Sequence, residues 1–389
     1  MRDAARLQAA IDIVDAVIHA ARTGGPPADA VVRDYFRSRR YAGSKDRRAV
    51  REFVYAMIRR HAEPPVSGRA AALGLAEDDG GLTALFDGSD HAPAPIRDDE
   101  QAAGRGAVPE WIAPSLSPLV DERERDALLD RAPLDVRVNV ARADRAAVQS
   151  DLGGEATPLS PWGLRFETDT RIDETPAFRE GRIEVQDEAS QLVALACAPQ
   201  GGQTIVDLCA GAGGKSLALA AAAPEARIIA CDVDKRRLGQ LPPRAERAGA
   251  RVETLLLDPP REAEGLAGLS GQADTALVDA PCSGSGTWRR SPELRWRVTP
   301  ERLDALAQSQ TRVLDLAAPL VKTGGRLVYA VCSLIEREGA GQVEAFLSRH
   351  SDWKVHPLPD WGRASGGGRL LTPGHDGTDG FFVAMLAKD

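Results

Sequence analysis

The chain has 389 residues, of which 43% are hydrophobic and 27% charged, and a formal net charge of -8. These proportions are ordinary for globular proteins, and they exclude a chain that is disordered throughout. The length predicts two or three domains. The acidic balance of the whole chain gives no sign of a nucleic-acid-binding protein, so any basic surface has to be sought locally.

The five cysteines are odd in number, and none is spaced as Cys-x-x-Cys. This pattern argues against a disulfide framework and against a zinc site, so we expect no metal. The first residues include Asp3, Asp12 and Asp15 and no unbroken apolar run, which is not typical of a signal or transit peptide. No apolar stretch is long enough for a membrane span. We therefore expect a cytoplasmic protein with free thiols and no membrane partner.

The N-terminal part predicts helices. Apolar residues at helical spacing recur over residues 7–18, 31–36 and 50–58. Between Arg33 and Arg60 there are ten basic residues and only three acidic ones. Such a cluster is either a solvated helical face or a surface that neutralises phosphates, and the sequence leaves both readings open. Residues 77–107 are rich in Asp, Gly and Pro and predict a long connection.

A small mixed segment precedes a longer alternation of strands and helices. Strands predicted at 136–140, 164–166 and 183–185, with a helix over 144–152, suggest a compact α/β module over residues 126–185. From residue 186 the βα alternation predicts a parallel sheet with helices on both faces and a last antiparallel pair at 354–356 and 381–386. Ligands bind outside the carboxyl ends of such strands. The predicted strands of the parallel part end at Asp207, Asp232, Asp258, Asp279 and Cys332.

The stretch from Thr204 to Lys215 predicts a buried strand, a glycine-rich turn and a helix start. A turn of this kind receives nucleotide-like ligands, although its spacing is not GxGxxG and a turn that binds nothing is the alternative. Asp232 follows the turn at the end of the next strand, where an acid takes the hydroxyls of a ribose, and Asp258 is placed for the base. Each acid could instead cap a helix. Close approach of the backbone is permitted by Gly211, Gly213 and Gly214.

Two thiols follow separate predicted strands. Cys282 lies in a glycine-rich loop three residues after Asp279, and Cys332 lies directly after the strand 327–331. If the two strands are neighbours, both thiols face one cleft. A thiolate is a nucleophile when a positive neighbour lowers its pKa, and Lys215 is a candidate neighbour. The alternative for Cys332 is an inert core thiol.

Together these segments resemble the motifs of the RsmB/Sun-type RNA (cytosine-5) methyltransferases. The resemblance runs from about Pro133 to the C-terminus and includes Val185–Ser190 and Thr378–Phe382. It implies a Rossmann-like S-adenosylmethionine-dependent domain over 186–389, an RRM-like module over 126–185 and, more faintly, a NusB-like RNA-binding helical domain over 1–125. The motifs that carry it are Asp207-Leu208-Cys209-Ala210, Gly213-Gly214-Lys215, Cys231-Asp232-Val233-Asp234, Asp279-Ala280-Pro281-Cys282-Ser283-Gly284-Ser285-Gly286 and Tyr329-Ala330-Val331-Cys332-Ser333.

The resemblance also implies roles for individual residues. Cys332 would attack carbon-6 of a cytosine, Cys282 would assist release of the product, and Asp279 would stabilise the charge on the base, with Lys215 orienting that acid. The glycine turn would hold the amino-acid end of S-adenosylmethionine, Asp232 its ribose and Asp258 its adenine. The full set implied for cofactor binding is Cys209, Ala210, Gly211, Ala212, Gly213, Gly214, Lys215, Asp232, Arg237, Asp258 and Asp279.

The implied activity is methylation of cytosine carbon-5 in RNA, of a 16S-type ribosomal RNA or else a transfer RNA, by a monomer. Residues 288–297 mix tryptophan and arginine and suggest an RNA-stacking surface, or else a partly buried aromatic pair. A non-catalytic RNA-binding or ribosome-assembly protein of the same fold is the alternative function; a nicotinamide-dependent dehydrogenase is disfavoured because GxGxxG is missing. The chain departs from the family pattern at Gly211-Ala212, where Ala-Pro is usual, at Pro242-Pro243, and at Gly339, where Asn is common.

Overall fold

The computed structural model of the protein describes all residues from Met1 to Asp389, and these form two compact units. Unit 1 comprises Met1–Leu116, Asp121–Asp130 and Thr287–Thr299; unit 2 comprises Ser117–Val120, Arg131–Gly286 and Pro300–Asp389. The segment 287–299 therefore joins unit 1, although it lies inside the range expected for the catalytic domain. The boundaries at residues 125 and 185 stay predictions. None of the helices combines the length and the apolar character that crossing a membrane requires.

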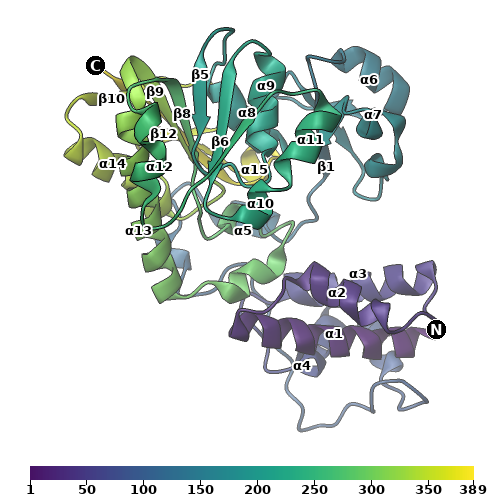
Figure 1. The fold of residues 1–389 in the computed structure, drawn as a ribbon. Coiled ribbons are helices and arrows are strands. Elements are labelled where there is room, and N and C mark those ends of the chain that lie inside the picture. The colour runs from purple at the N-terminus through teal and green to yellow at the C-terminus, as the bar shows by residue number, and fades with distance from the viewer. The chain divides into compact units, whose positions relative to one another are not determined.

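Unit 1 is helical (Figure 1). The predicted helical faces are confirmed, because Leu7, Val14, Val54 and Ile58 are buried in one apolar cluster. Helix α1 ends where Gly24 takes a φ of 69°, a left-handed conformation that glycine adopts without strain. The elements are α1 (Asp3–Thr23), α2 (Ala28–Arg37), α3 (Ser44–Arg60), α4 (Gly68–Asp78), α5 (Glu122–Ala127) and the 3₁₀ turns η1 (Gly80–Leu85), η2 (Ala113–Ser115) and η6 (Pro292–Arg297).

The aromatic and basic residues of segment 288–297 do not form an exposed stacking surface, so that expectation is wrong. Trp288 is fully buried and Trp296 is 5% exposed. The indole Nε1 of Trp296 donates to the carbonyl of His61 at 2.9 Å, and the buried guanidinium of Arg295 donates to the carbonyl of Ala107 at 2.5 Å. Trp296 and Arg295 thus anchor the segment in unit 1, since buried polar groups need partners.

Unit 2 contains a small four-stranded antiparallel sheet in the order β2-β3-β1-β4. Its apolar face packs in a cluster that includes Val136, Val138 and Leu164, as the alternating pattern of the sequence predicts. The side chain of Asp144 caps the helix that follows β1. The elements are β1 (Leu134–Val138), α6 (Arg145–Leu152), β2 (Glu155–Ala156), β3 (Gly163–Phe166), η3 (Ile172–Glu174), α7 (Pro176–Arg179) and β4 (Ile183–Val185).

The rest of unit 2 is a nine-stranded sheet in the order β11-β12-β13-β9-β8-β5-β6-β7, with β10 paired to β13, and helices lie on both sides of it (Figure 1). Strands β9, β8, β5, β6 and β7 are parallel, and β10 to β13 add antiparallel pairs. The strands are β5 (Thr204–Asp207), β6 (Arg227–Asp232), β7 (Glu253–Leu256), β8 (Ala273–Asp279), β9 (Val321–Val331), β10 (Trp353–His356), β11 (Arg363–Ser365), β12 (Gly368–Leu371) and β13 (Phe381–Lys388). The helices are α8 (Glu188–Ala196), α9 (Gly214–Ala222), α10 (Lys235–Leu238), α11 (Leu241–Ala248), α12 (Glu262–Leu266), α13 (Pro300–Ala317), α14 (Ala340–Arg349) and α15 (Pro373–Asp376), with the 3₁₀ turns η4 (Ala267–Leu269), η5 (Ser285–Thr287), η7 (Ala318–Leu320) and η8 (Glu336–Glu338).

This sheet confirms the predicted fold class, a Rossmann-like α/β domain beside a small α/β module and a mostly helical N-terminal part. Strand order reverses around β5, whose neighbours are β8 and β6, and such a reversal is where open α/β sheets bind ligands. The departure at Pro242-Pro243 coincides with an interruption of the helix after β6, because α10 ends at Leu238 and α11 begins anew at Leu241 with prolines in its first turn. The hairpin β11–β12 was not predicted.

Candidate active site

The glycine turn between β5 and α9 follows the course that its sequence predicts. Gly211 and Gly213 have φ of 57° and 81°, a region that disfavours side chains. A Cβ on Gly213 would lie 2.2 Å from Cδ1 of Leu241. The carboxylate of Asp232, which is 6% exposed, accepts from the backbone N–H of Gly211 at 2.6 Å and of Asp234 at 2.7 Å. Asp232 therefore ties the end of β6 to the turn.

Two arginines approach the same turn. A Cβ on Gly211 would lie 2.5 Å from Nη2 of Arg237, so this guanidinium lies directly against the turn. Arg244 donates to the carbonyl of Ala212 at 2.6 Å and to the carboxylate of Glu184 on β4 at 3.0 Å. The turn is therefore held from α11 as well as from β6, and a cation lies beside it.

Asp258 lies apart from this buried arrangement. It follows β7, its side chain is 66% exposed, and its carboxylate pairs with Arg261. The structure thus places Asp258 near the end of the strand next to β6, as predicted, but as an exposed acid already engaged in an ion pair. Its assignment to the adenine stays a prediction.

The two thiols predicted to face one cleft lie in contact. The Sγ atoms of Cys282 and Cys332 are 3.4 Å apart, each at the carboxyl end of one of the paired strands β8 and β9. The backbone N–H of Gly286 donates to the carbonyl of Cys332 at 3.1 Å, which joins the two loops. The contact with Cys332 and burial raise the pKa of the Cys282 thiol well above its ordinary value. Cys282 therefore stays protonated at neutral pH.

Lys215 and Asp279 form an ion pair at the same edge. The Nζ of Lys215 is 2.6 Å from Oδ2 of Asp279 and 5.2 Å from the ring centroid of Phe381. Burial alone would lower the pKa of Lys215, but the Asp279 carboxylate outweighs burial and leaves that pKa above its ordinary value. The first residues of α9 thus bring a permanent cation to the acid that ends β8.

The strand-ending acid Asp207 has no role in the predicted set, but it lies under the turn. It is fully buried; Oδ2 accepts from the hydroxyl of Ser216 at 2.6 Å and Oδ1 has no hydrogen-bond partner. Burial raises the pKa of Asp207 to about 7. Burial also raises the pKa of the neighbouring Cys209 thiol well above its ordinary value. The only sequence signal of the Asp207–Ser216 pair was an Asp at a strand end, nine residues before a Ser.

A second loop completes the surroundings of the thiols. The backbone N–H of Gly380 donates to the carbonyl of Gly286 at 2.8 Å, and a Cβ on Gly286 would lie 2.0 Å from the carbonyl oxygen of Gly380. The segment Thr378–Phe382, which is part of the family resemblance, thus packs backbone to backbone against the loop that carries Cys282. Only glycine fits at this crossing.

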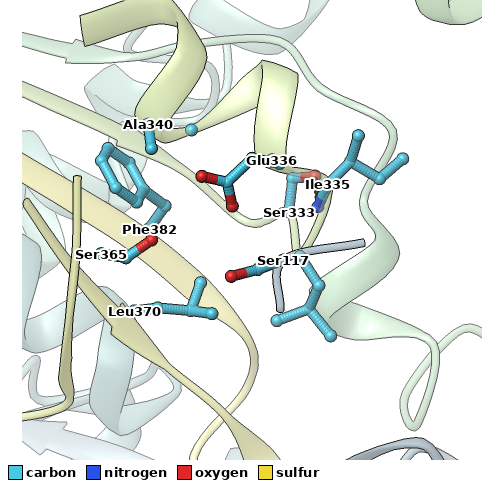
Figure 2. A pocket seen from close by; sticks show the side chains of 10 residues that line it. Ser117, Ser333, Ile335, Glu336, Ala340, Ser365, Leu370 and Phe382 are labelled. Carbon is cyan, nitrogen blue, oxygen red and sulfur yellow. Dashed lines mark hydrogen bonds between the residues drawn. The ribbon is translucent and has the colours of Figure 1, made fainter. Parts of the chain in front are cut away.

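A small pocket lies behind Ser333, the residue after Cys332, and Figure 2 shows its lining. Its empty volume of about 160 Å³ is below the range of pockets that hold small molecules. Elsewhere in the structure no three His, Cys, Asp or Glu side chains cluster in a way that could hold a metal ion.

Known proteins are similar to this chain in sequence. A sequence profile described as 16S rRNA methyltransferase RsmB/F matches residues 194–387. Ribosomal RNA small subunit methyltransferase B of Salmonella paratyphi C (strain RKS4594) is 35% identical over 288 residues, which cover 72% of this chain and 66% of that protein. The same-named protein of Escherichia coli (strain K12) is 34% identical over the same lengths. The match thus spans 66% of these relatives' own length.

Two solved structures extend the similarity to the fold. The crystal structure of PH0851 has a TM-score of 0.77 and 26% identity, and the match covers 98% of this chain and 99% of that one. A methyltransferase homolog protein from Pyrococcus horikoshii has a TM-score of 0.61 and 27% identity, with 71% and 92% covered. Together with the sequence motifs and the thiol pair at the sheet edge, these similarities show that the chain belongs to the RsmB/Sun-type methyltransferase family.

Proposed function

We propose that this protein transfers a methyl group from S-adenosylmethionine to carbon-5 of a cytosine in RNA, with small-subunit ribosomal RNA as the substrate. The observation that carries the proposal is the contact of Cys282 and Cys332 beside the Lys215–Asp279 pair. A thiol nucleophile, a second thiol and a held carboxylate at one strand edge are what methylation of an unreactive aromatic carbon requires.

The residues around the glycine turn fit S-adenosylmethionine. The left-handed Gly211 and Gly213 keep side chains out of the turn, and Arg237 offers a cation for a carboxylate. Each oxygen of Asp232 accepts one backbone N–H and keeps a lone pair for a ribose hydroxyl. When bound, S-adenosylmethionine supplies an electrophilic methyl group. The remaining assigned residues, Cys209, Ala210, Ala212, Gly214 and Asp258, are proposed as its surroundings on the same grounds.

The chain's own residues then carry the reaction on the base. The Cys332 thiolate forms a bond to carbon-6, and the electron pair displaced from the ring double bond makes carbon-5 nucleophilic. Asp279, held by Lys215, forms hydrogen bonds to the ring nitrogen and the amino group of the cytosine, where charge builds as the bond to carbon-6 forms. Carbon-5 takes the methyl group with S-adenosylhomocysteine as the leaving group. Carbon-5 then gives its proton to water, and the electron pair of that bond restores the double bond as the bond between carbon-6 and the Cys332 sulfur breaks. Cys282, which stays a thiol at neutral pH, does not compete as nucleophile and assists this release.

The N-terminal helices supply the proposed RNA contact of unit 1. Arg33, Arg40, Lys45 and Arg51 lie on or between α2 and α3 and are exposed. Clustered cations neutralise phosphates and give affinity without sequence preference. Both a solvated face and an RNA surface would expose these four side chains; we propose the RNA surface, and the salt dependence of RNA binding distinguishes the two.

The test is methyl transfer from labelled S-adenosylmethionine to RNA, with bisulfite mapping of the modified cytosine. We expect no transfer and no covalent RNA adduct from Cys332→Ala, and an adduct that survives denaturing gels from Cys282→Ala. The control is Cys197→Ala, which removes a buried thiol that has no proposed catalytic role and should keep full activity. RNA binding without any transfer by the parent protein would favour a non-catalytic RNA-binding protein instead.

A further inference from the structure

One fully buried carboxylate belongs to none of the roles assigned above. Glu338 ends the turn η8 after β9, and its exposed fraction is 0%. Its charge is held by four hydrogen bonds from neutral donors rather than by an ion pair. They come from the backbone N–H and hydroxyl of Ser283, the hydroxyl of Ser333 and the amide of Gln310 on α13.

Three of these four hydrogen bonds come from the residues that directly follow the two cysteines. The hydroxyls of Ser283 and Ser333 donate to the same oxygen, Oε2, at 2.5 and 2.6 Å. The other oxygen, Oε1, accepts from the N–H of Ser283 at 2.9 Å and from Nε2 of Gln310 at 3.0 Å. One carboxylate therefore joins the loop that carries Cys282 to the loop that carries Cys332.

A third hydroxyl completes this serine–glutamate cluster, which we define as Ser283, Ser285, Ser333 and Glu338. Ser285 Oγ lies 3.0 Å from Ser333 Oγ and accepts from the N–H of Leu334 at 2.9 Å. All four members are buried. The cluster thus joins the backbone segments that directly follow both thiols.

Stability alone does not explain a buried anion at this place. A carboxylate taken out of water without a counter-ion costs several kcal/mol, and well-packed apolar residues often serve a core better. Charge-assisted hydrogen bonds are short and directional, so their gain is geometric specificity. Misplacement of reacting groups by about 1 Å costs roughly a hundredfold in rate, which makes such specificity valuable beside a nucleophile.

We propose that Glu338 is a positioning residue that holds Cys282 and Cys332 in contact by accepting the hydroxyls of Ser283 and Ser333 on one oxygen. Its carboxylate accepts hydrogen bonds from Ser283, Ser333 and Gln310 and from neither thiol, so it acts through the two loops. The inference rests on the proposed methyl transfer for its consequence in rate, but the geometry of the loops can be measured without it.

The experiment compares Glu338→Ala and Glu338→Gln with the parent and with Glu336→Gln. Glu336 is a matched control because it lies two residues away, in the pocket of Figure 2, and is not a member of the cluster. Three measurements are made on each protein: kcat and KM for RNA methylation, hydrogen exchange of peptides covering residues 282–287 and 332–339, and the dissociation constant for S-adenosylhomocysteine. The dissociation constant for S-adenosylhomocysteine reports whether the glycine turn stays intact.

We expect kcat to fall about a hundredfold in Glu338→Ala and about tenfold in Glu338→Gln, whose amide nitrogen accepts no hydrogen bond. KM and the dissociation constant should stay within about twofold of the parent, and Glu336→Gln should behave as the parent does. Exchange should accelerate in both loops together. Where Glu338→Ala does not fold, Glu338→Gln decides by the same criteria.

A kcat within about twofold of the parent in the folded Glu338 variants would overturn the inference. The inference would also be overturned if the affinity for S-adenosylhomocysteine fell as much as kcat, because both losses would then come from a general loosening of unit 2. If the parent transfers no methyl group at all, the proposed function fails, and hydrogen exchange alone decides. Unchanged exchange in the two loops then refutes the positioning role, and faster exchange confined to them supports it.

Discussion

The buried pair of Lys215 and Asp279 predicts an asymmetry that can be measured. The side chain of Lys215 is 10% exposed, and that of Asp279 is 29% exposed. Removing Asp279 leaves an ammonium group with little access to water. Removing Lys215 leaves a carboxylate that water reaches. Asp279→Ala should therefore destabilise unit 2 more than Lys215→Met does.

The structure sets the magnitude of each change. At a separation of 2.6 Å and an effective dielectric constant of about 20, the pair attracts by about 6 kcal/mol, most of which offsets the desolvation of Lys215. Loss of one partner from a buried pair costs about 3–5 kcal/mol. We expect about 3 kcal/mol for Asp279→Ala, because the Phe381 ring at 5.2 Å partly compensates the cation. For Lys215→Met, which keeps the volume and leaves a solvated acid, we expect about 1 kcal/mol.

The assay is hydrogen exchange of peptides from β5 and β8 at increasing urea concentration. It reports the opening of unit 2 by itself, whereas a single optical transition would mix two units. Lys322→Met is the control, because Lys322 pairs with Asp274 but its side chain is 48% exposed, and its loss should change stability by less than about 1 kcal/mol. If Asp279→Ala is at least as stable as Lys215→Met, then the burial of the unpaired Lys215 ammonium group is not the dominant cost in the free energy of unfolding, and the reasoning is refuted.

Three further predictions concern other parts of the molecule. Burial raises the pKa of Asp207 to about 7 in the folded protein, above its unfolded value, so the unfolded chain releases this proton first as pH rises. The free energy of unfolding should therefore fall between about pH 4 and 7. Asp207→Asn should remove this contribution to the fall, as measured by urea titrations at several pH values. Gly286→Ala should abolish the contact with Gly380, because the added Cβ would lie 2.0 Å from the Gly380 carbonyl oxygen. We expect the free energy of unfolding to fall by more than about 3 kcal/mol in the same exchange assay. A variant as stable as the parent would contradict this prediction. Replacing Arg33, Arg40, Lys45 and Arg51 together by Gln should reduce the slope of log affinity for RNA against log salt by about 3, as measured by filter binding; an unchanged slope would mean that these cations are only a solvated face.

The sequence predicted the sheet edge because strand ends leave a strong local signal. Asp207, Asp232 and Asp279 each end the strand that was expected, and Cys332 directly follows another. Buried parallel strands are short apolar runs, and a polar residue marks where each leaves the core. The shared cleft of the two thiols was expected only if their strands were neighbours, and the structure supplies that condition, because β8 and β9 pair and the Sγ atoms lie 3.4 Å apart.

Other features could not be predicted because they depend on contacts far apart in sequence. Trp296 and Arg295 look like an RNA-binding pair in sequence, but they bond to the carbonyls of His61 and Ala107, about 190 to 240 residues away. The hairpin β11–β12 has only three or four residues in each strand, so its alternation is too short to recognise. Glu338 precedes Gly339 in the family pattern, but the sequence assigns it no role, and only the structure shows its burial and its serine partners.

The departure from the family pattern at Gly211-Ala212 acquires a physical account from the arginines around it. A proline at Ala212 would stiffen the turn by fixing its own φ, and this chain lacks that constraint. Arg244 instead donates to the carbonyl of Ala212 at 2.6 Å while Glu184 orients its guanidinium. A Cβ at Gly211 would displace Arg237, the far end of a flexible side chain, so glycine here allows the cation to lie against the turn. The stiffness that a proline supplies from within the turn is thus supplied from α11 and β4, which makes the turn depend on the small sheet as well as on its own glycines.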